Sequence, residues 1–210
     1  MQIDNPDRGF SYKVEGPLDL RMNPQKGTSA AQRLKEVTEE ELVGMLVENA
    51  DEPYAVEIAA TVMKWFKNGK PIETTTHMKQ VIEQALCYVP KAEREEAVKK
   101  SCARTFQALR IDVNSEFEVL YTFLEKLPEV LAPNGRVAIL TFHSGEDRLV
   151  KSMINELSSG CTCPRDFPVC VCGKKPVLKN LTRHPIISGE EELENNPRAR
   201  SAKLRICEKL

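Results

Sequence analysis

A short polar segment, residues 142–148, holds the densest group of side chains suited to chemistry, with the sequence Phe-His-Ser-Gly-Glu-Asp-Arg. It follows an apolar run that has the length of a buried strand. Ligands of open α/β sheets bind beyond the carboxyl ends of the strands, so His143 and Glu146 are placed to orient a substrate or accept a proton. The same residues also suit a helix start capped by Ser144, and both interpretations stay open. A Ser–His hydrolase is disfavoured because no G-x-S-x-G motif is present.

A second cluster consists of four closely spaced thiols. They are Cys161, Cys163, Cys170 and Cys172. Tetrahedral zinc is bound by four soft ligands, and this short segment supplies them locally. The two C-x-C pairs differ from the commoner C-x₂-C spacing, so a surface loop of free or reversibly oxidised thiols is the alternative. The other three cysteines, Cys87, Cys102 and Cys207, are expected to be buried as small apolar residues.

Glycine spacing excludes the common nucleotide-binding loops. The closest pair among the 10 glycines is Gly9 and Gly16, so the chain contains no G-x-G. Rossmann dinucleotide loops and P-loops need glycines two to five positions apart. A self-contained fold of either kind is therefore excluded.

Charge and hydropathy favour a cytoplasmic protein without a membrane segment. The 210 residues carry 30 basic and 31 acidic side chains, a net charge of −1, so any nucleic-acid binding depends on local patches. Two basic clusters, residues 174–183 and 198–205, suit either phosphate contacts or a charge-protected edge strand. No run of eighteen apolar residues or signal peptide is present, and the cysteine count is odd.

The order of the predicted helices and strand that must position these groups is typical of an α/β fold. Helices are predicted in the first half of the chain by a capping box formed by Thr38 and Glu41 and by a cap among residues 74–76. The mixed-charge run 91–100 that follows is interpreted as a solvated helical face or a linker. A longer helix is expected over 103–127. The apolar run 137–142 predicts a strand buried on both faces, as in a parallel sheet. A single strand cannot form a sheet. We therefore expect either that the basic segment 199–206 forms a second strand or that the chain is part of a larger unit.

Five motifs, taken in order, resemble the RsmH (MraW) family of 16S ribosomal RNA cytosine-N4 methyltransferases. They occupy residues 8–12, 16–22, 104–111, 142–148 and 196–205. The resemblance runs from the first residues to the last. One departure is Gly145, where the family usually carries Leu.

The resemblance implies an α/β fold: part of a Rossmann-like S-adenosylmethionine-dependent methyltransferase domain with an inserted, mostly helical domain. Residues 1–27 and 103–210 would form the second half of the catalytic domain, and 28–102 the insert. The family's glycine-rich cofactor loop would lie before residue 1. Gln2 alone matches a cofactor-binding position. We therefore expect the isolated chain to be inactive without that N-terminal segment, which a separate chain could supply.

The implied reaction transfers a methyl group from S-adenosyl-L-methionine to the exocyclic N4 of a cytidine in 16S ribosomal RNA of the small subunit. Candidates for the catalytic, proton-accepting side are His143, Glu146 and Asp19. RNA-binding residues are expected within the same motifs. They are Arg8, Phe10, Arg21, Arg104, Arg198, Arg200 and Lys203. The alternative is a non-enzymatic RNA-binding or assembly module that keeps the substrate-facing motifs without catalysis.

Overall fold

The chain forms two compact units, Met1–Glu116 and Phe117–Leu210, in a computed structural model. The structure describes residues 5–161, 163, 169 and 171–210. Each unit has its own apolar core. The first is built from helices and the second from a small sheet with helices, so the mixed helix-and-sheet composition expected from the sequence is confirmed.

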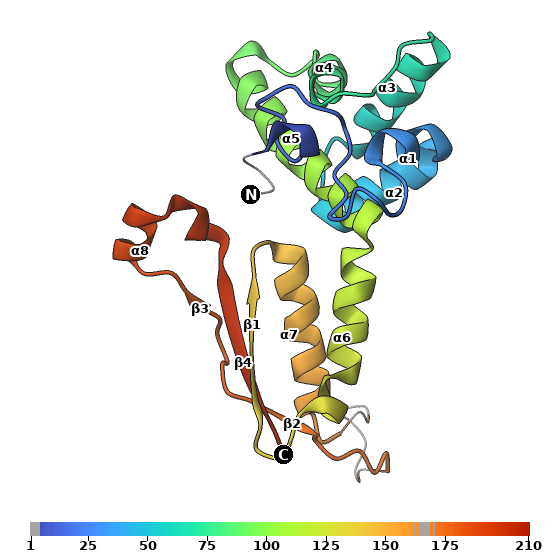
Figure 1. Cartoon of the computed structure of the whole chain (residues 1–210). Coiled ribbons are helices and arrows are strands. Elements are labelled where there is room, and N and C mark those ends of the chain that lie inside the picture. The colour runs from blue at the N-terminus through green and yellow to red at the C-terminus, as the bar shows by residue number, and fades with distance from the viewer. Residues whose placement is uncertain (1–4, 162, 164–168, 170) are drawn as a thin grey trace. The chain divides into compact units, whose positions relative to one another are not determined.

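Helices pack around one core in the first unit (Figure 1). They are α1 (Ala30–Glu36), α2 (Glu39–Ala50), α3 (Ala55–Lys67), α4 (Thr75–Ala85) and α5 (Lys91–Asn114), preceded by the 3₁₀ turn η1 (Pro6–Arg8). The predicted capping box is confirmed, because Thr38 and Glu41 hydrogen-bond each other's backbone N–H groups at the start of α2. Thr74 caps α4 as predicted. Local polar residues therefore fix where α2 and α4 begin.

The expected single helix over 103–127 is wrong. The mixed-charge run 91–100 forms the first turns of α5 and is mostly exposed, so its interpretation as a solvated helical face is confirmed. The chain breaks at Ser115, whose φ of 48° is left-handed, before α6 (Glu116–Val130). A residue in this conformation ends an α-helix, and no glycine marked the position in the sequence. The predicted boundary between residues 102 and 103 lies inside α5. The division into 1–27 with 103–210 and 28–102 stays a prediction.

The sheet of the second unit is antiparallel and centred on the C-terminal strand. Strand β4 (Lys203–Lys209) pairs with β1 (Arg136–Thr141), β2 (Leu178–Asn180) and β3 (Ile186–Ile187). The register places Leu140 opposite Leu204. The C-terminal segment thus supplies the strand partner expected from the sequence. In chain order, β4 follows the short helix α8 (Glu190–Asn195) and the 3₁₀ turn η2 (Pro197–Ser201).

Within the described residues of the second unit, helices cover one face of this sheet and not the other. Helices α6 and α7 (Ser144–Ser158) lie on the same side of β1 and β4 (Figure 1), and their apolar side chains share a core with Cys207. Exposure alternates along β1, with Leu140 52% exposed while Thr141 is buried. The prediction of a strand buried on both faces is therefore wrong for the described residues, because helices cover only one side.

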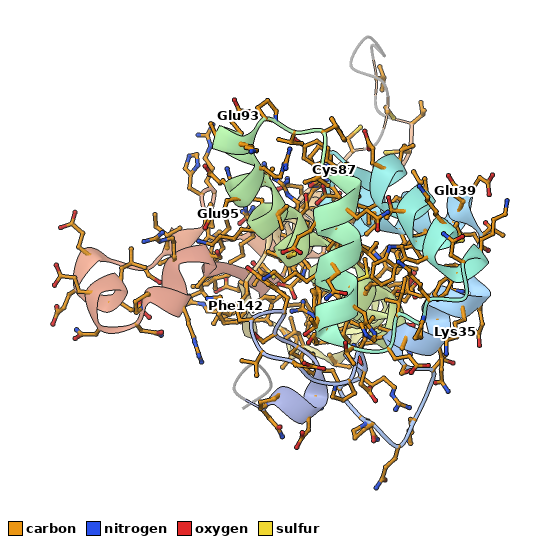
Figure 2. The ribbon with its side chains drawn as sticks, turned by 90° about the horizontal axis from the view of Figure 1, so that it is seen from above. Lys35, Glu39, Cys87, Glu93, Glu95 and Phe142 are labelled. Atoms are coloured by element: carbon orange, nitrogen blue, oxygen red, sulfur yellow. The ribbon has the colours of Figure 1, made fainter. Side chains whose placement is uncertain are left out.

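The cysteines outside the thiol cluster differ in burial. Cys102 and Cys207 are buried as predicted, and burial raises the pKa of the Cys102 thiol to about 12. Cys87 is exposed just after α4 (Figure 2), so its prediction as a core residue is wrong. It lies in the turn between α4 and α5, where its side chain is exposed although those of Leu86 and Val89 are buried.

A buried ion pair fastens α7 to the central strand. Arg205 donates from Nε to Oδ1 of Asp147 at 2.7 Å and from Nη2 to Oδ2 at 3.1 Å. Lys203 lies 3.4 Å from the same carboxylate. This arrangement overturns the edge-strand interpretation of residues 203–205, because β4 has partners on both sides. The hydrogen bonds from Arg205, opposed by burial, and the charges of Arg205 and Lys203 hold the pKa of Asp147 below its usual range.

We predict that Asp147→Asn lowers the free energy of unfolding of the second unit by about 3–5 kcal/mol, because it leaves the Arg205 guanidinium buried without its counter-charge. The folded-state pKa of Asp147 is depressed, so its contribution is complete above the unfolded pKa of about 3.9 and is lost as pH falls through the folded pKa. Acid unfolding should become less steep in the variant. Urea titrations across acid pH measure both effects.

The matched control is Glu208→Gln, which breaks the exposed pair between Glu208 and Arg136 on the same sheet. Its cost should stay below about 1 kcal/mol. Equal losses in the two variants would contradict the role assigned to Asp147.

Candidate functional site

Two motifs near the N-terminus fold against each other at backbone contact distance. A Cβ atom at Gly9 would lie 2.0 Å from the carbonyl oxygen of Pro17, and one at Gly16 would lie 2.1 Å from that of Pro6. Gly9 also has a φ of 71°, which L side chains rarely adopt. Both glycines are therefore required by close approach of the backbone, and neither belongs to a phosphate loop.

Arg8 and Arg21 hold this loop in place. Nη2 of Arg8 donates to the backbone carbonyls of Arg21 at 3.0 Å and Met22 at 2.6 Å. The guanidinium of Arg8 also lies over the ring of Phe10, 5.4 Å from its centroid. Arg21 binds both carboxylate oxygens of Asp19, at 2.8 and 2.7 Å, and donates from Nη1 to the carbonyl of Gly27. The two arginines predicted to bind RNA thus make several internal contacts.

The Asp19 carboxylate is consequently ionised and engaged. Hydrogen bonding from Arg21 holds its pKa below the usual range, against the opposing effect of burial. The pair is two residues apart, and the left-handed Leu20 between them, with a φ of 63°, turns both side chains to one side. Asp19 therefore offers a fixed negative charge whose two oxygens already accept hydrogen bonds.

The first turn of α7 presents the second group of candidates. The N-cap is His143, and not Ser144 as the sequence interpretation had it: Nδ1 of His143 accepts from the Glu146 N–H at 3.4 Å. Oε2 of Glu146 accepts in return from the N–H groups of Phe142 at 2.8 Å and His143 at 3.3 Å. His143 and Glu146 are thus brought together by a capping box in which histidine takes the place of serine or threonine.

The polar atoms left over in this box are Nε2 of His143 and Oε1 of Glu146, which lie 3.3 Å apart. Because Nδ1 is an acceptor, the neutral imidazole carries its proton on Nε2, which is buried and makes no aligned hydrogen bond to any described residue. Burial raises the pKa of Glu146, but the adjacent His143 side chain and the backbone N–H groups of Phe142 and His143 lower it by more, so the net shift is downward. The box holds a carboxylate beside an imidazole.

Gly145 makes room for an aromatic ring next to this box. A Cβ atom at this position would lie 2.7 Å from Cζ of Phe117, whose ring is 5.9 Å from that of His143. A larger residue at position 145 requires the Phe117 ring to move. Nothing in the local sequence pointed to Phe117, because 28 positions separate it from Gly145.

The remaining predicted site residues are distributed over both units. Arg104 is half-buried on α5, whereas Arg198 and Arg200 are exposed in η2 and Lys203 begins β4. Gln2, the predicted cofactor contact, lies outside the described residues. Their roles in binding RNA or cofactor stay predictions.

Three of the four thiols come together. The Sγ atoms of Cys161, Cys163 and Cys172 all lie within 4.8 Å of one another, and those of Cys161 and Cys172 are 3.9 Å apart. Cys170 lies outside the described residues. The described part of the cluster therefore has the proximity that a shared metal ion needs.

Comparison with known proteins covers the whole chain. The sequence model of the MraW methylase family matches residues 1–210. The ribosomal RNA small subunit methyltransferase H 1 of Lachnoclostridium phytofermentans is 53% identical over 205 residues, which are 98% of this chain and 52% of that protein. Methyltransferase H 2 of Acholeplasma laidlawii is 53% identical over 208 residues, 99% of this chain and 56% of that protein.

Another relative, the ribosomal RNA small subunit methyltransferase H of Carboxydothermus hydrogenoformans, is 46% identical over 209 residues, 100% of this chain and 65% of that protein. The chain thus spans about half to two thirds of the length of these relatives. Among the described residues, no helix is long and apolar enough to cross a membrane.

We predict that Gly9→Ala destabilises the first unit by roughly 2–5 kcal/mol, the sum of about 1–2 for a left-handed backbone and about 1–3 for overpacking against a carbonyl. Gly27→Ala is the matched control, because Gly27 has a φ of 73° and nothing within 4 Å of its would-be Cβ atom. Gly27→Ala should lower the free energy of unfolding only by the contribution of the left-handed backbone, about 1–2 kcal/mol. Denaturant unfolding followed by tryptophan fluorescence reports on this unit through Trp65, and equal losses would refute the close-approach argument.

Proposed function

The chain belongs to the MraW methylase family, and on that premise we propose that it is the part of an S-adenosylmethionine-dependent methyltransferase that acts on the exocyclic N4 of a cytidine in 16S ribosomal RNA. The observation that carries the proposal is the family match over all of residues 1–210. Relatives at 46–53% identity are named as methyltransferases of small-subunit ribosomal RNA. RNA within the small ribosomal subunit is the proposed partner.

The chemistry requires help on the nucleophile side. The lone pair of a cytosine N4 is delocalised into the ring, so attack on the methyl carbon needs close, in-line positioning and an acceptor that draws the amino proton away. A new N–CH₃ bond forms as the S–CH₃ bond of the sulfonium breaks, and the amino group gives up one proton. An ionised carboxylate or a neutral imidazole can accept that proton.

We propose that the pair of His143 and Glu146 provides this acceptor. Support comes from the capping box, in which Oε1 of Glu146 is left as an acceptor with Nε2 of His143 beside it to orient it, whereas both oxygens of Asp19 are bound by Arg21. The lowered pKa of Glu146 keeps its carboxylate ionised at neutral pH. Asp19 would then act by holding the N-terminal loop. A base flipped out of the RNA could stack on an exposed aromatic ring such as Phe142.

We further propose that residues 1–210 alone do not bind S-adenosylmethionine appreciably, and that a polypeptide carrying the rest of the family's catalytic domain completes the site, whether joined to the chain or separate. The open sheet supports this. Among the described residues β1 pairs only with β4, which leaves its other edge unpaired, and Leu140 and Phe142 are exposed. An unpaired apolar edge strand is a template for further strands.

The thiol cluster is proposed to bind zinc in a structural role. Four sulfur ligands about 2.3 Å from a tetrahedral zinc ion lie roughly 3.8 Å from one another. The separation between Cys161 and Cys172 is 3.9 Å, and Cys163 is within 4.8 Å of both. Cys170 is the fourth candidate by sequence spacing. The ion would hold together the segment between α7 and β2.

The test of the methyltransferase uses residues 1–210 alone and mixed with the remaining segment of the Lachnoclostridium phytofermentans relative. Small subunits lacking the modification are incubated with S-adenosylmethionine, and N4-methylcytidine is measured by mass spectrometry of digested RNA. We expect product only in the mixture, and no saturable heat of cofactor binding to the chain alone. RNA binding without methylation in the mixture would favour the non-enzymatic module instead.

In that mixture Glu146→Gln should lower the methylation rate about 100-fold, since a positioned proton acceptor contributes at least that much. Glutamine also fits a capping box, so the helix start is kept while the charge is lost. Glu156→Gln, on the exposed face of the same helix, is the control and should leave the rate unchanged. Equal rates for wild type and Glu146→Gln would exclude the carboxylate as proton acceptor.

Zinc is tested by elemental analysis of the purified chain and by the absorption of the cobalt-substituted form. We expect one equivalent of metal and intense thiolate-to-cobalt bands, both lost in Cys163→Ser. Cys87→Ser removes an exposed thiol elsewhere and should retain the metal. A wild-type chain that binds neither ion would rule the site out.

A further inference from the structure

A hollow lined by basic and amide side chains lies between α7 and the loop that follows β2. Its volume is about 510 Å³, within the range of small-ligand pockets. The lining side chains, called here the basic pocket, are Lys151, Asn155, Asn180, Arg183, His184 and Arg205. All belong to the second unit, and of these only Arg205 lies within a motif that carried the family resemblance.

The charge of the basic pocket is one-sided. The lining contains three cations, one imidazole and two amides, and no carboxylate. Arg205 is balanced by Asp147. In contrast, the side chains of Lys151, Arg183 and His184 form no hydrogen bond or ion pair with any of the residues that the structure describes. Two cations are thus left to attract an anion.

The loop that carries Arg183 and His184 is held in place. The N–H of Leu181 donates to the carbonyl of Ile206 at 3.0 Å, and the Ile206 N–H donates to Oγ1 of Thr182 at 2.9 Å. Oδ1 of Asn180 accepts from the Thr182 N–H at 3.0 Å. These bonds fasten the loop to the central strand, so its two basic side chains start from fixed backbone positions.

Helix α7 supplies the opposite wall. Lys151 and Asn155 are four residues apart and therefore lie on one face of the helix. Asn155 Oδ1 is 3.5 Å from Nδ2 of Asn180, which leaves the Asn155 amide group as a donor. The walls thus offer ammonium, guanidinium and amide N–H donors to the same space. That combination of donors matches the oxygens of a phosphate group.

We propose that the basic pocket binds a backbone phosphate of the RNA, through Lys151 and Arg183 as charge partners and the Asn155 and Asn180 amides as further donors. The proposal rests on RNA as the proposed partner of the chain. The exposure of Lys151 and Arg183 favours a polyanion that passes over the surface, because a small free anion would remain fully hydrated there.

The experiment measures binding of a fluorescent single-stranded RNA oligonucleotide to the full chain by anisotropy at several salt concentrations. For Lys151→Gln combined with Arg183→Gln, we expect affinity at low salt to fall about tenfold or more. The slope of log K against log salt should shrink by about 1.4, at roughly 0.7 for each lost contact with single-stranded nucleic acid. Lys126→Gln combined with Lys67→Gln removes the same charge from exposed positions outside the pocket and outside both basic clusters, and should leave the slope nearly unchanged.

A second measurement locates the ligand. The side-chain amide resonances of Asn155 and Asn180 are followed by NMR during titration with the oligonucleotide and, separately, with inorganic pyrophosphate. Shifts with RNA that disappear in the double variant support the proposal. Equal effects of the two double variants, or shifts with pyrophosphate and none with RNA, would overturn it. Failure of the methyltransferase proposal is distinguishable, because it appears as absent N4-methylcytidine with RNA binding intact.

Discussion

The arrangement of the second unit depends on the C-terminal strand β4, which pairs with the neighbouring strands and is joined to helix α7 by an ion pair. β4 hydrogen-bonds to β1, β2 and β3, and its Arg205 forms the buried ion pair with Asp147 of α7. A buried charge without its partner is costly, so this pair fixes the helix on the sheet. The position of α7 in turn sets where His143 and Glu146 lie. The residues proposed to accept the proton, at the start of α7, are thus held in place through β4.

Arginine has two uses in this molecule. Arg8 and Arg21 are bound to backbone carbonyls and to Asp19, so their charges stabilise the N-terminal loop. Arg183 projects into the basic pocket without an ion-pair partner among the described residues. With a net charge of −1, the chain gains nothing from global attraction to RNA, so the proposed RNA binding depends on such locally unbalanced cations.

The unpaired edge of the sheet and the family comparison both support the proposal that a further polypeptide segment completes the catalytic domain. The chain spans about half the length of its first relatives, and β1 keeps an unpaired edge among the described residues. Exposed apolar strands are normally paired or covered. The zinc proposal is independent of this, since Cys161, Cys163 and Cys172 gather within one segment. Metal binding can therefore be tested without the rest of a catalytic domain.

Features that depend on neighbouring residues could be predicted from the sequence: the capping box at Thr38, a strand within the apolar run, observed as Arg136–Thr141, and the family motifs. The sequence could not place the break at Ser115, the burial of only one face of β1, or His143 as the cap of α7. Each of these depends on contacts between distant segments. Asp147 and Arg205 are 58 positions apart, and only their burial together shows that they are partners. The sparse glycines show the same division. Their spacing argued against a self-contained Rossmann loop or P-loop, whereas the fold revealed that Gly9 and Gly16 are needed because carbonyl groups lie against them.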